Sequence, residues 1–522
     1  MNVLPRLSIT KYRMQMLTSS RQYKSPVFFC AGVPLAVTGL LWWSSAYEVS
    51  LLQAFAAFIL AWIPWASYRR WNRGDRREIP LSALITGMFW LAYAVPLFLG
   101  SHDMGLVGGT HHLSEDSLSG PLCLAVGGVV ALLAGVRIAR WSRWVPAISL
   151  DVSNSPSRWK YLRVVLVSGI LLRIFVPIDA LGPEARQVFS NLENILPAVT
   201  FAILFRHVLR GKSSDLDRFL VLAYVFIVLA LGLSSGWLGS FVALGLICGA
   251  IYVNEYRKLP LMALLIILPL ILFFQPAKSE FRSRFWRSDS SASHLERITF
   301  WVNRSFGMWK TVIADPSGEG ARDLVDNTLS RFSLLQQTAN VMELTPEVVP
   351  YQYGRLYSYV AVTLIPRFVW PEKPSVSDAN RWYQVSYRLT SPRELGGVSI
   401  GAGMLAESYI NFGWFGPLLV MLPLGVFLEL FNTTFLRHTS GLLSNSLGVV
   451  LLPGLIGIEA QLALYVAGLA QQVAIVLVVL VPELDFRHRR KFGNGTLAQR
   501  VYPVPADPSA RLKARALSRV HP

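Results

Sequence analysis

The chain has 522 residues, of which 53% are hydrophobic and 15% charged, and its formal net charge is +18. Long uncharged apolar runs of membrane-spanning length exclude an ordinary set of soluble domains. The positive charge does not indicate nucleic acid binding, because Lys and Arg collect in alternate short loops, as is typical of the cytoplasmic side of a membrane protein.

The apolar runs predict an all-α integral membrane protein with about twelve transmembrane helices. We expect these spans at residues 26–44, 49–67, 80–99, 120–137, 164–181, 195–208, 219–234, 237–253, 260–275, 414–431, 445–461 and 465–482. With a cytoplasmic N-terminus, the distribution of Lys and Arg puts both termini in the cytoplasm and one large segment outside it.

Four parts are expected in chain order. An N-terminal membrane bundle of about nine spans covers 1–275, and the large external segment covers 276–413. About three spans follow within 414–485. The basic tail over 486–522 is expected to be disordered and to lie against anionic cytoplasmic lipid.

The external segment is too long for a structureless connection. Helical spacing predicts amphipathic helices over 294–313 and 324–344. The apolar stretch 354–365 is too short to cross a bilayer, which favours an interfacial or re-entrant segment. A short helix is predicted to end at Asn411, which puts Glu407 about one turn above the membrane core.

A cationic group, FFQPAKSEFRSRFWR (273–287), follows the ninth predicted span. Arg282 and Arg284 lie where a lipid headgroup would enter, and a guanidinium suits bidentate contact with phosphate oxygens. Anchoring by long cationic side chains at the interface is the alternative. Arg173 lies inside the fifth predicted span, where it faces a protein interior or a wet cavity, or extends to the interface.

The stretch 365–415 concentrates charged and aromatic residues beside the apolar helices. Arg367 and Lys373 are candidate phosphate ligands, and the Glu407 carboxylate is a candidate proton acceptor. Flat rings suit sugar faces, so a candidate sugar platform consists of Trp370, Trp382, Tyr383 and Tyr409. Charges in the middle of the loop, such as Arg388, are expected to pair with one another.

Signatures of several other chemistries are missing from the sequence. No His or Cys cluster has zinc-like spacing, and there is no phosphate-binding loop, dinucleotide fingerprint or GxSxG motif. Cys30, Cys123 and Cys248 fall inside predicted spans, which indicates small buried residues and no disulfide framework. We therefore expect neither a metal nor a cofactor.

Two motifs carry a resemblance to a known family. IPRFVWPEKP (365–374), followed by GMLAESYINFGWFGPLLVMLPLGV (403–426), resembles the Wzy-type polymerases of bacterial polysaccharides, which are related to O-antigen ligases. The predicted topology, with a late large external loop, agrees with this family. The matching residues are Pro366, Arg367, Trp370, Pro371, Lys373, Pro374, Glu407, Asn411, Phe412, Gly413 and Gly416.

The resemblance implies a multi-pass glycosyltransferase of the bacterial inner membrane that works at the periplasmic face. Its donor would be a glycan on undecaprenyl diphosphate, and its acceptor the sugar of another lipid-linked repeat unit. A flippase, a chain-length regulator and membrane lipid are the implied partners, and nucleic acid is not. External arginines of the family carry over to Arg367 and, less directly, to Arg282 and Arg284. The periplasmic His of the ligases has no counterpart in the matched segment, so Glu407 is left as the candidate base.

The chemistry of such a transfer suits these residues. Diphosphate is a good leaving group, so the reaction needs cations at the departing phosphate more than a strong acid. The diphosphate ligands would be Arg282, Arg284, Arg173 and Lys373, with Arg367 at the reacting centre. A single displacement would invert the anomeric configuration without a metal ion. The alternatives are a ligase that transfers glycan to lipid A core or protein, and a glycolipid transporter without chemistry.

Overall fold

The computed structural model of the chain describes residues 27–45, 47–74, 78–100, 102–142, 150–152, 156–176, 183–286, 292–315, 318, 320, 333–365, 370, 372–395, 400–437, 440–480 and 484–486. Residues 1–487 belong to one compact unit. Arg367, Pro366, Pro371 and the predicted tail from 487 onward lie outside the described residues.

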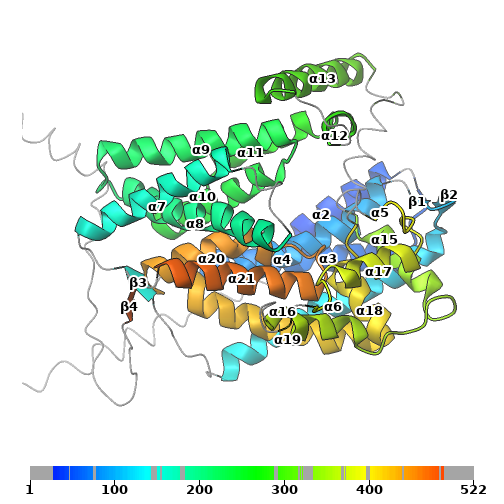
Figure 1. Cartoon of the computed structure of the whole chain (residues 1–522). Coiled ribbons are helices and arrows are strands. Elements are labelled where there is room, and N and C mark those ends of the chain that lie inside the picture. The colour runs from blue at the N-terminus through cyan, green and yellow to red at the C-terminus, as the bar shows by residue number, and fades with distance from the viewer. Residues whose placement is uncertain are drawn as a thin grey trace, which may run out of the picture. The chain divides into compact units, whose positions relative to one another are not determined.

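The first half of the chain is almost entirely helical (Figure 1). Its elements are α2 (Val27–Ser44), α3 (Leu51–Arg73), α4 (Leu81–Phe89), η1 (Trp90–Ala94), α5 (Val95–Leu99), β1 (Asp103–Leu106), β2 (Gly109–His112), η2 (Glu115–Leu118), α6 (Ser119–Ser142), β3 (Leu150–Val152), α7 (Pro156–Phe175), α8 (Pro183–Leu209), α9 (Asp215–Ser235), α10 (Gly239–Tyr256) and α11 (Leu261–Phe274).

The second half begins with α12 (Lys278–Phe285) and α13 (His294–Ala314), which pack against each other, and α13 also contacts α9 (Figure 1). The elements that follow are α15 (Leu335–Leu344), η4 (Arg355–Tyr357), α16 (Ser358–Leu364), α17 (Asp378–Ser386), α18 (Gly403–Phe412), η5 (Gly413–Phe415), α19 (Gly416–Phe431), η6 (Asn432–Leu436), α20 (Leu442–Leu455), α21 (Leu462–Leu480) and β4 (Leu484–Phe486). Among the described residues, the strands form two small antiparallel pairs, β1 with β2 and β3 with β4.

The chain is a multi-pass, all-α membrane protein. In the described part, eight helical segments are long and apolar enough to cross a membrane: Leu51–Arg73, Leu81–Leu99, Glu115–Ser142, Leu192–Leu209, Asp215–Ser235, Gly239–Tyr256, Gly403–Leu436 and Leu462–Leu480. The bent pair of α11 and α12 would make a ninth. The prediction of twelve spans was therefore wrong.

The difference in span number has physical causes, although a helix occupies each of the twelve predicted positions. α20 has 14 residues, so at about 1.5 Å per residue it is shorter than a bilayer core of about 30 Å. α7 begins earlier than predicted and includes the cations Lys160 and Arg163. α11 and α12 meet at 57°, because Pro276 between them interrupts the helical hydrogen bonds.

The structure contains most of the helices that were predicted in the external segment. The amphipathic helix predicted over 294–313 is α13, and the short apolar stretch 354–365 contains η4 and α16. Of the helix predicted over 324–344, only 335–344 is helical within the described residues. The predicted short helix before Gly413 is α18, and it belongs to the apolar segment Gly403–Leu436.

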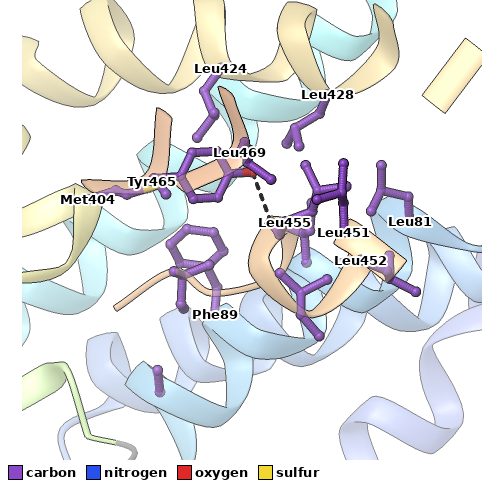
Figure 2. Packing of buried hydrophobic residues seen from close by; sticks show 14 of the residues in the cluster. Leu81, Phe89, Met404, Leu424, Leu428, Leu451, Leu452, Leu455, Tyr465 and Leu469 are labelled. Carbon is purple, nitrogen blue, oxygen red and sulfur yellow. Dashed lines mark hydrogen bonds between the residues drawn. The ribbon is translucent and has the colours of Figure 1, made fainter. Parts of the chain in front are cut away.

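The core between α20 and α21 fixes the turn that joins them. Tyr465 of α21 donates a hydrogen bond of 3.0 Å to the carbonyl oxygen of Leu455 at the end of α20 (Figure 2). Met404 of α18 and Phe89 of α4 lie around the same ring (Figure 2). Because these side chains are almost completely buried, the turn over 456–461 is held at one position against the start of α18.

Buried acidic residues elsewhere in the bundle are paired with cations. Glu429 of α19 is 3% exposed and lies 3.0 Å from Arg140 of α6. Asp217 at the start of α9 is 1% exposed and lies 2.7 Å from Arg163 of α7. A buried charge is tolerated when it is paired and hydrogen-bonded, and these pairs tie neighbouring helices together.

The most extensive helix contact in the described part joins α6 and α19, and it depends on two glycines. A Cβ atom on Gly135 would lie 2.0 Å from the Leu422 carbonyl oxygen, and one on Gly425 would lie 2.0 Å from the Leu132 carbonyl oxygen. Small residues let membrane helices approach this closely.

We expect Gly135→Ala to separate α6 from α19 and to destabilise the fold by about 1–3 kcal/mol, the usual range for overpacking. Thermal unfolding of the detergent-solubilised protein measures this. Gly127→Ala is the matched control, because a Cβ atom there meets nothing within 4 Å. Equal midpoints for the two variants would contradict the close contact.

Candidate functional site

The candidate site is built around Glu407 of α18. Its side chain is 0% exposed, and Oε2 accepts a hydrogen bond of 2.7 Å from the N–H of Leu462, the first residue of α21. Its other oxygen, Oε1, has no hydrogen-bond partner. No described cation forms an ion pair with it, in contrast to Glu429 and Asp217. The N-terminal N–H groups of a helix lack intrahelical acceptors, so Glu407 also stabilises the start of α21.

Local sequence explains how α18 reaches the start of α21. The N–H groups of Gly403 and Met404 donate to the carbonyl oxygens of Glu459 and Ile458, at 3.1 and 3.2 Å. A Cβ atom on Gly401 would lie 2.4 Å from the Glu459 carbonyl oxygen, so only glycine fits there. Gly403 adopts a φ of 76°, which favours glycine for a second reason.

Gln461 lies immediately before α21 and is its N-cap residue, because its carbonyl oxygen accepts from the N–H of Tyr465 at 3.0 Å. The side chain is 1% exposed, and neither its amide oxygen nor its amide nitrogen has a partner. Buried amides are normally satisfied by protein or by water, so this one needs an explanation.

Tyr357 belongs to η4, which packs against α18. Asn411 at the end of α18 accepts a hydrogen bond of 3.0 Å from the N–H of Gly354, and the Tyr357 ring stacks on Phe412 at 6.0 Å. The Tyr357 hydroxyl oxygen is buried without a partner. Burial, and then the nearby charge of Glu407, raise the pKa of Tyr357 well above its ordinary value, so the phenol keeps its proton.

The cations predicted at the end of the ninth span lie on α12 among aromatic rings. The Arg282 guanidinium is 4.2 Å from the centre of the Trp286 ring and 5.7 Å from that of Trp237. The Lys278 ammonium lies 5.9 Å from the Trp237 ring. Cation–π contacts with these rings hold the Arg282 and Lys278 side chains in position on α12.

The charge of Lys278 on α12 acts on Glu459, in the turn before α21. Burial raises the pKa of the Glu459 carboxyl, and the Lys278 ammonium opposes that rise. Glu459 is also the residue whose carbonyl oxygen binds Gly403. The turn over 456–461 therefore joins the start of α18 to the start of α21, and Lys278 of α12 acts on it electrostatically.

The other predicted phosphate ligands lie in different surroundings. Arg284 stacks on Phe300 of α13 at 4.7 Å. Arg173 is half-buried in the last turn of α7, and its charge acts on Tyr224 of α9. Lys373 donates to the carbonyl oxygens of Ile365 and Val362, at 2.7 and 3.3 Å, and so caps α16. Arg367 lies outside the described residues.

The predicted sugar platform is divided between the core and the surface. Tyr383 is 0% exposed and packs against Tyr387 at 5.3 Å, and Tyr409 is 5% exposed between Tyr351 and Trp414. These two rings are part of the packed interior. Trp370 is 41% exposed and Trp382 is half-buried, so both keep accessible surface.

Three residues of the site were missed in the sequence. Gln461 and Glu459 were included in the eleventh predicted span (445–461), although two polar residues at the end of an apolar run are a usable signal. Tyr357 was included in an apolar stretch, and only tertiary contact brings it to Glu407. In the described part of the chain, no group of three His, Cys, Asp or Glu residues is placed to hold a metal ion.

A comparison with known protein families finds one match, to the family described as "Domain of unknown function (DUF8712)", over residues 145–437. This region contains α7 to α19, including Glu407, and ends before the turn that carries Gln461. No curated protein and no solved structure matches the chain.

We expect Glu407→Gln to fold normally, because the amide oxygen still accepts from the N–H of Leu462. Glu407→Leu has a similar volume but leaves that N–H unpaired, which destabilises a buried site by about 1–3 kcal/mol. Thermal unfolding of the purified variants tests this. A Glu407→Leu midpoint equal to that of Glu407→Gln would mean that the hydrogen bond does not form.

Proposed function

The chain belongs to the DUF8712 family, and we propose that it is a membrane glycosyltransferase that polymerises undecaprenyl-diphosphate-linked repeat units. The proposed place is the periplasmic face of a bacterial inner membrane, with both termini in the cytoplasm. The resemblance of 365–374 and 403–426 to Wzy-type polymerases suggests the reaction. A flippase that supplies the substrate and a chain-length regulator are the proposed partners.

The main support for the proposal is that Glu407 is a buried carboxylate with one unpaired oxygen, beside a turn on which the charge of Lys278 acts. Lys278 of α12 acts on Glu459, and the same turn ends at Leu462, which holds Glu407. Structural carboxylates such as Glu429 have a cation beside them, whereas Glu407 keeps one oxygen without a partner. Perturbed, incompletely satisfied groups are typical of functional sites.

The proposed reaction is a single displacement. A hydroxyl oxygen of the acceptor sugar attacks the anomeric carbon of the donor, and the bond from that carbon to the diphosphate oxygen breaks. Glu407 Oε1 takes the hydroxyl proton, and the undecaprenyl diphosphate leaves with the bonding electrons. Lys278 and Arg282 stabilise the charge on the departing diphosphate. The anomeric configuration is inverted.

The other predicted residues have supporting roles in the proposed reaction. Arg367 remains a proposed ligand of the leaving group on the strength of the resemblance. Trp370 and Trp382 are the proposed sugar-stacking residues, since they keep accessible surface, whereas Tyr383 and Tyr409 support the fold beneath them. Lys373 acts through the cap on α16 and not through the diphosphate.

We expect the purified wild-type chain in lipid bilayers to elongate its lipid-linked repeat unit without nucleotide. Glu407→Gln should slow elongation by about 10²–10⁴-fold, the usual contribution of a general base. Arg282→Gln should slow it by about 10²-fold through lost charge stabilisation. The measurement is the length distribution of labelled glycan over time.

Two matched controls isolate the site. Arg381→Gln removes another cation of the same predicted segment, an exposed one paired with Asp378 at 3.1 Å, and should leave elongation unchanged. Glu429→Gln removes a buried carboxylate that is paired with a cation. It should lower the thermal stability of the protein more than it lowers the elongation rate of the folded fraction. Normal elongation by folded Glu407→Gln would remove Glu407 from the proposed reaction.

A deletion strain distinguishes the alternative activities. A polymerase leaves single lipid-linked repeat units when it is lost, whereas a ligase leaves long polymer on the lipid carrier. A transporter would move glycolipid across the bilayer without making a new glycosidic bond in the purified assay.

A further inference from the structure

Three elements that meet at the start of α21 carry four buried polar atoms without a partner among the described residues. They are Glu407 Oε1 of α18, the Tyr357 hydroxyl oxygen of η4 and both amide atoms of Gln461. The hydrogen bond from Leu462 to Glu407 places the carboxylate one residue from Gln461, and η4, which carries Tyr357, packs against both α18 and α21. The N–H groups of Ala463 and Leu464 lie in the same first turn, where a helix offers no intrahelical acceptor.

So many unsatisfied groups in one place indicate a bound molecule. A single buried polar atom without a partner costs about 1–3 kcal/mol. Native proteins normally satisfy such groups with protein, water or a ligand. The described protein atoms do not provide the partners here, and water or a polar ligand can.

The chemistry of the four atoms selects the class of that group. Glu407 Oε1 and the Gln461 amide oxygen accept hydrogen bonds, whereas the Gln461 amide nitrogen and the protonated Tyr357 hydroxyl donate them. A metal ion would need acceptors alone. A phosphate would need donors alone, and the Glu407 carboxylate would repel it. Hydroxyl groups both donate and accept, so they complement the whole set.

We propose that this site binds the acceptor sugar, with its attacking hydroxyl on Glu407 Oε1 and a neighbouring hydroxyl on the Gln461 amide. The assignment rests on the proposed polymerase function and adds the subsite that selects the acceptor. Of the three side chains, Tyr357 alone has accessible surface, so the sugar reaches the site past the Tyr357 ring.

The test varies the acceptor separately from the donor. Lipid-linked repeat unit is extracted from cells that lack the chain, and part of it is treated with mild acid to release the free oligosaccharide. The free oligosaccharide can accept but cannot donate, because it has lost its diphosphate. Wild-type protein in bilayers then makes a lipid-free dimer, and its rate is measured at varied concentrations of each substrate.

We expect Gln461→Met to raise the KM for the free oligosaccharide at least tenfold while the KM for the lipid-linked donor changes less than twofold. Gln461→Asn keeps both amide atoms and should recover part of the affinity. Gln384→Met is the matched control, because Gln384 is also buried and has an unpaired amide oxygen, but it lies on α17 and binds Ile400. It should leave both KM values unchanged.

Three results would overturn this assignment while leaving the polymerase intact. Unchanged KM values in folded Gln461→Met, with a higher unfolding midpoint, would mean that the site holds only structural water. Equal rises of both KM values, or equal effects in Gln384→Met, would mean a general effect on the fold. Failure of the wild-type protein to make any dimer or polymer would instead reject the proposed function itself.

Discussion

The hydrogen bond between the Glu407 carboxylate and the N–H of Leu462 is the interaction on which the rest of the site depends. It joins a short helix of the predicted external segment to the last membrane-crossing helix. It also fixes one carboxylate oxygen and leaves the other unused. A buried carboxylate without a cation is costly, and the hydrogen bond from Leu462 offsets only part of that cost.

Around this bond, three parts of the chain are held by a single turn. The carbonyl groups of Ile458 and Glu459 receive the start of α18, and the Tyr465 hydroxyl holds the end of α20. The charge of Lys278 on α12 also acts on Glu459 of this turn. The proposed reaction uses these two features together, the cations of α12 at the leaving diphosphate and the Glu407 carboxylate at the attacking hydroxyl.

The sequence was most informative where structure is local. Apolar periodicity predicted both ends of α13 to within one residue, and Gly413 predicted the end of α18. The span number was overestimated, because apolar length alone did not reveal the bend at Pro276 or the short α20. Glu407, the candidate base in the sequence, is fully buried and has one oxygen without a partner among the described residues. Gln461, Glu459 and Tyr357 could not be placed beside it, because they meet only through tertiary contacts.

The most direct measurement is a cryo-EM structure of the chain in a lipid nanodisc with its lipid-linked repeat unit. The account predicts a sugar hydroxyl within hydrogen-bonding distance of Glu407 Oε1 and the Gln461 amide, and the diphosphate against Lys278 and Arg282. A glycan bound at another part of the protein, with ordered water alone on Glu407 and Gln461, would contradict it.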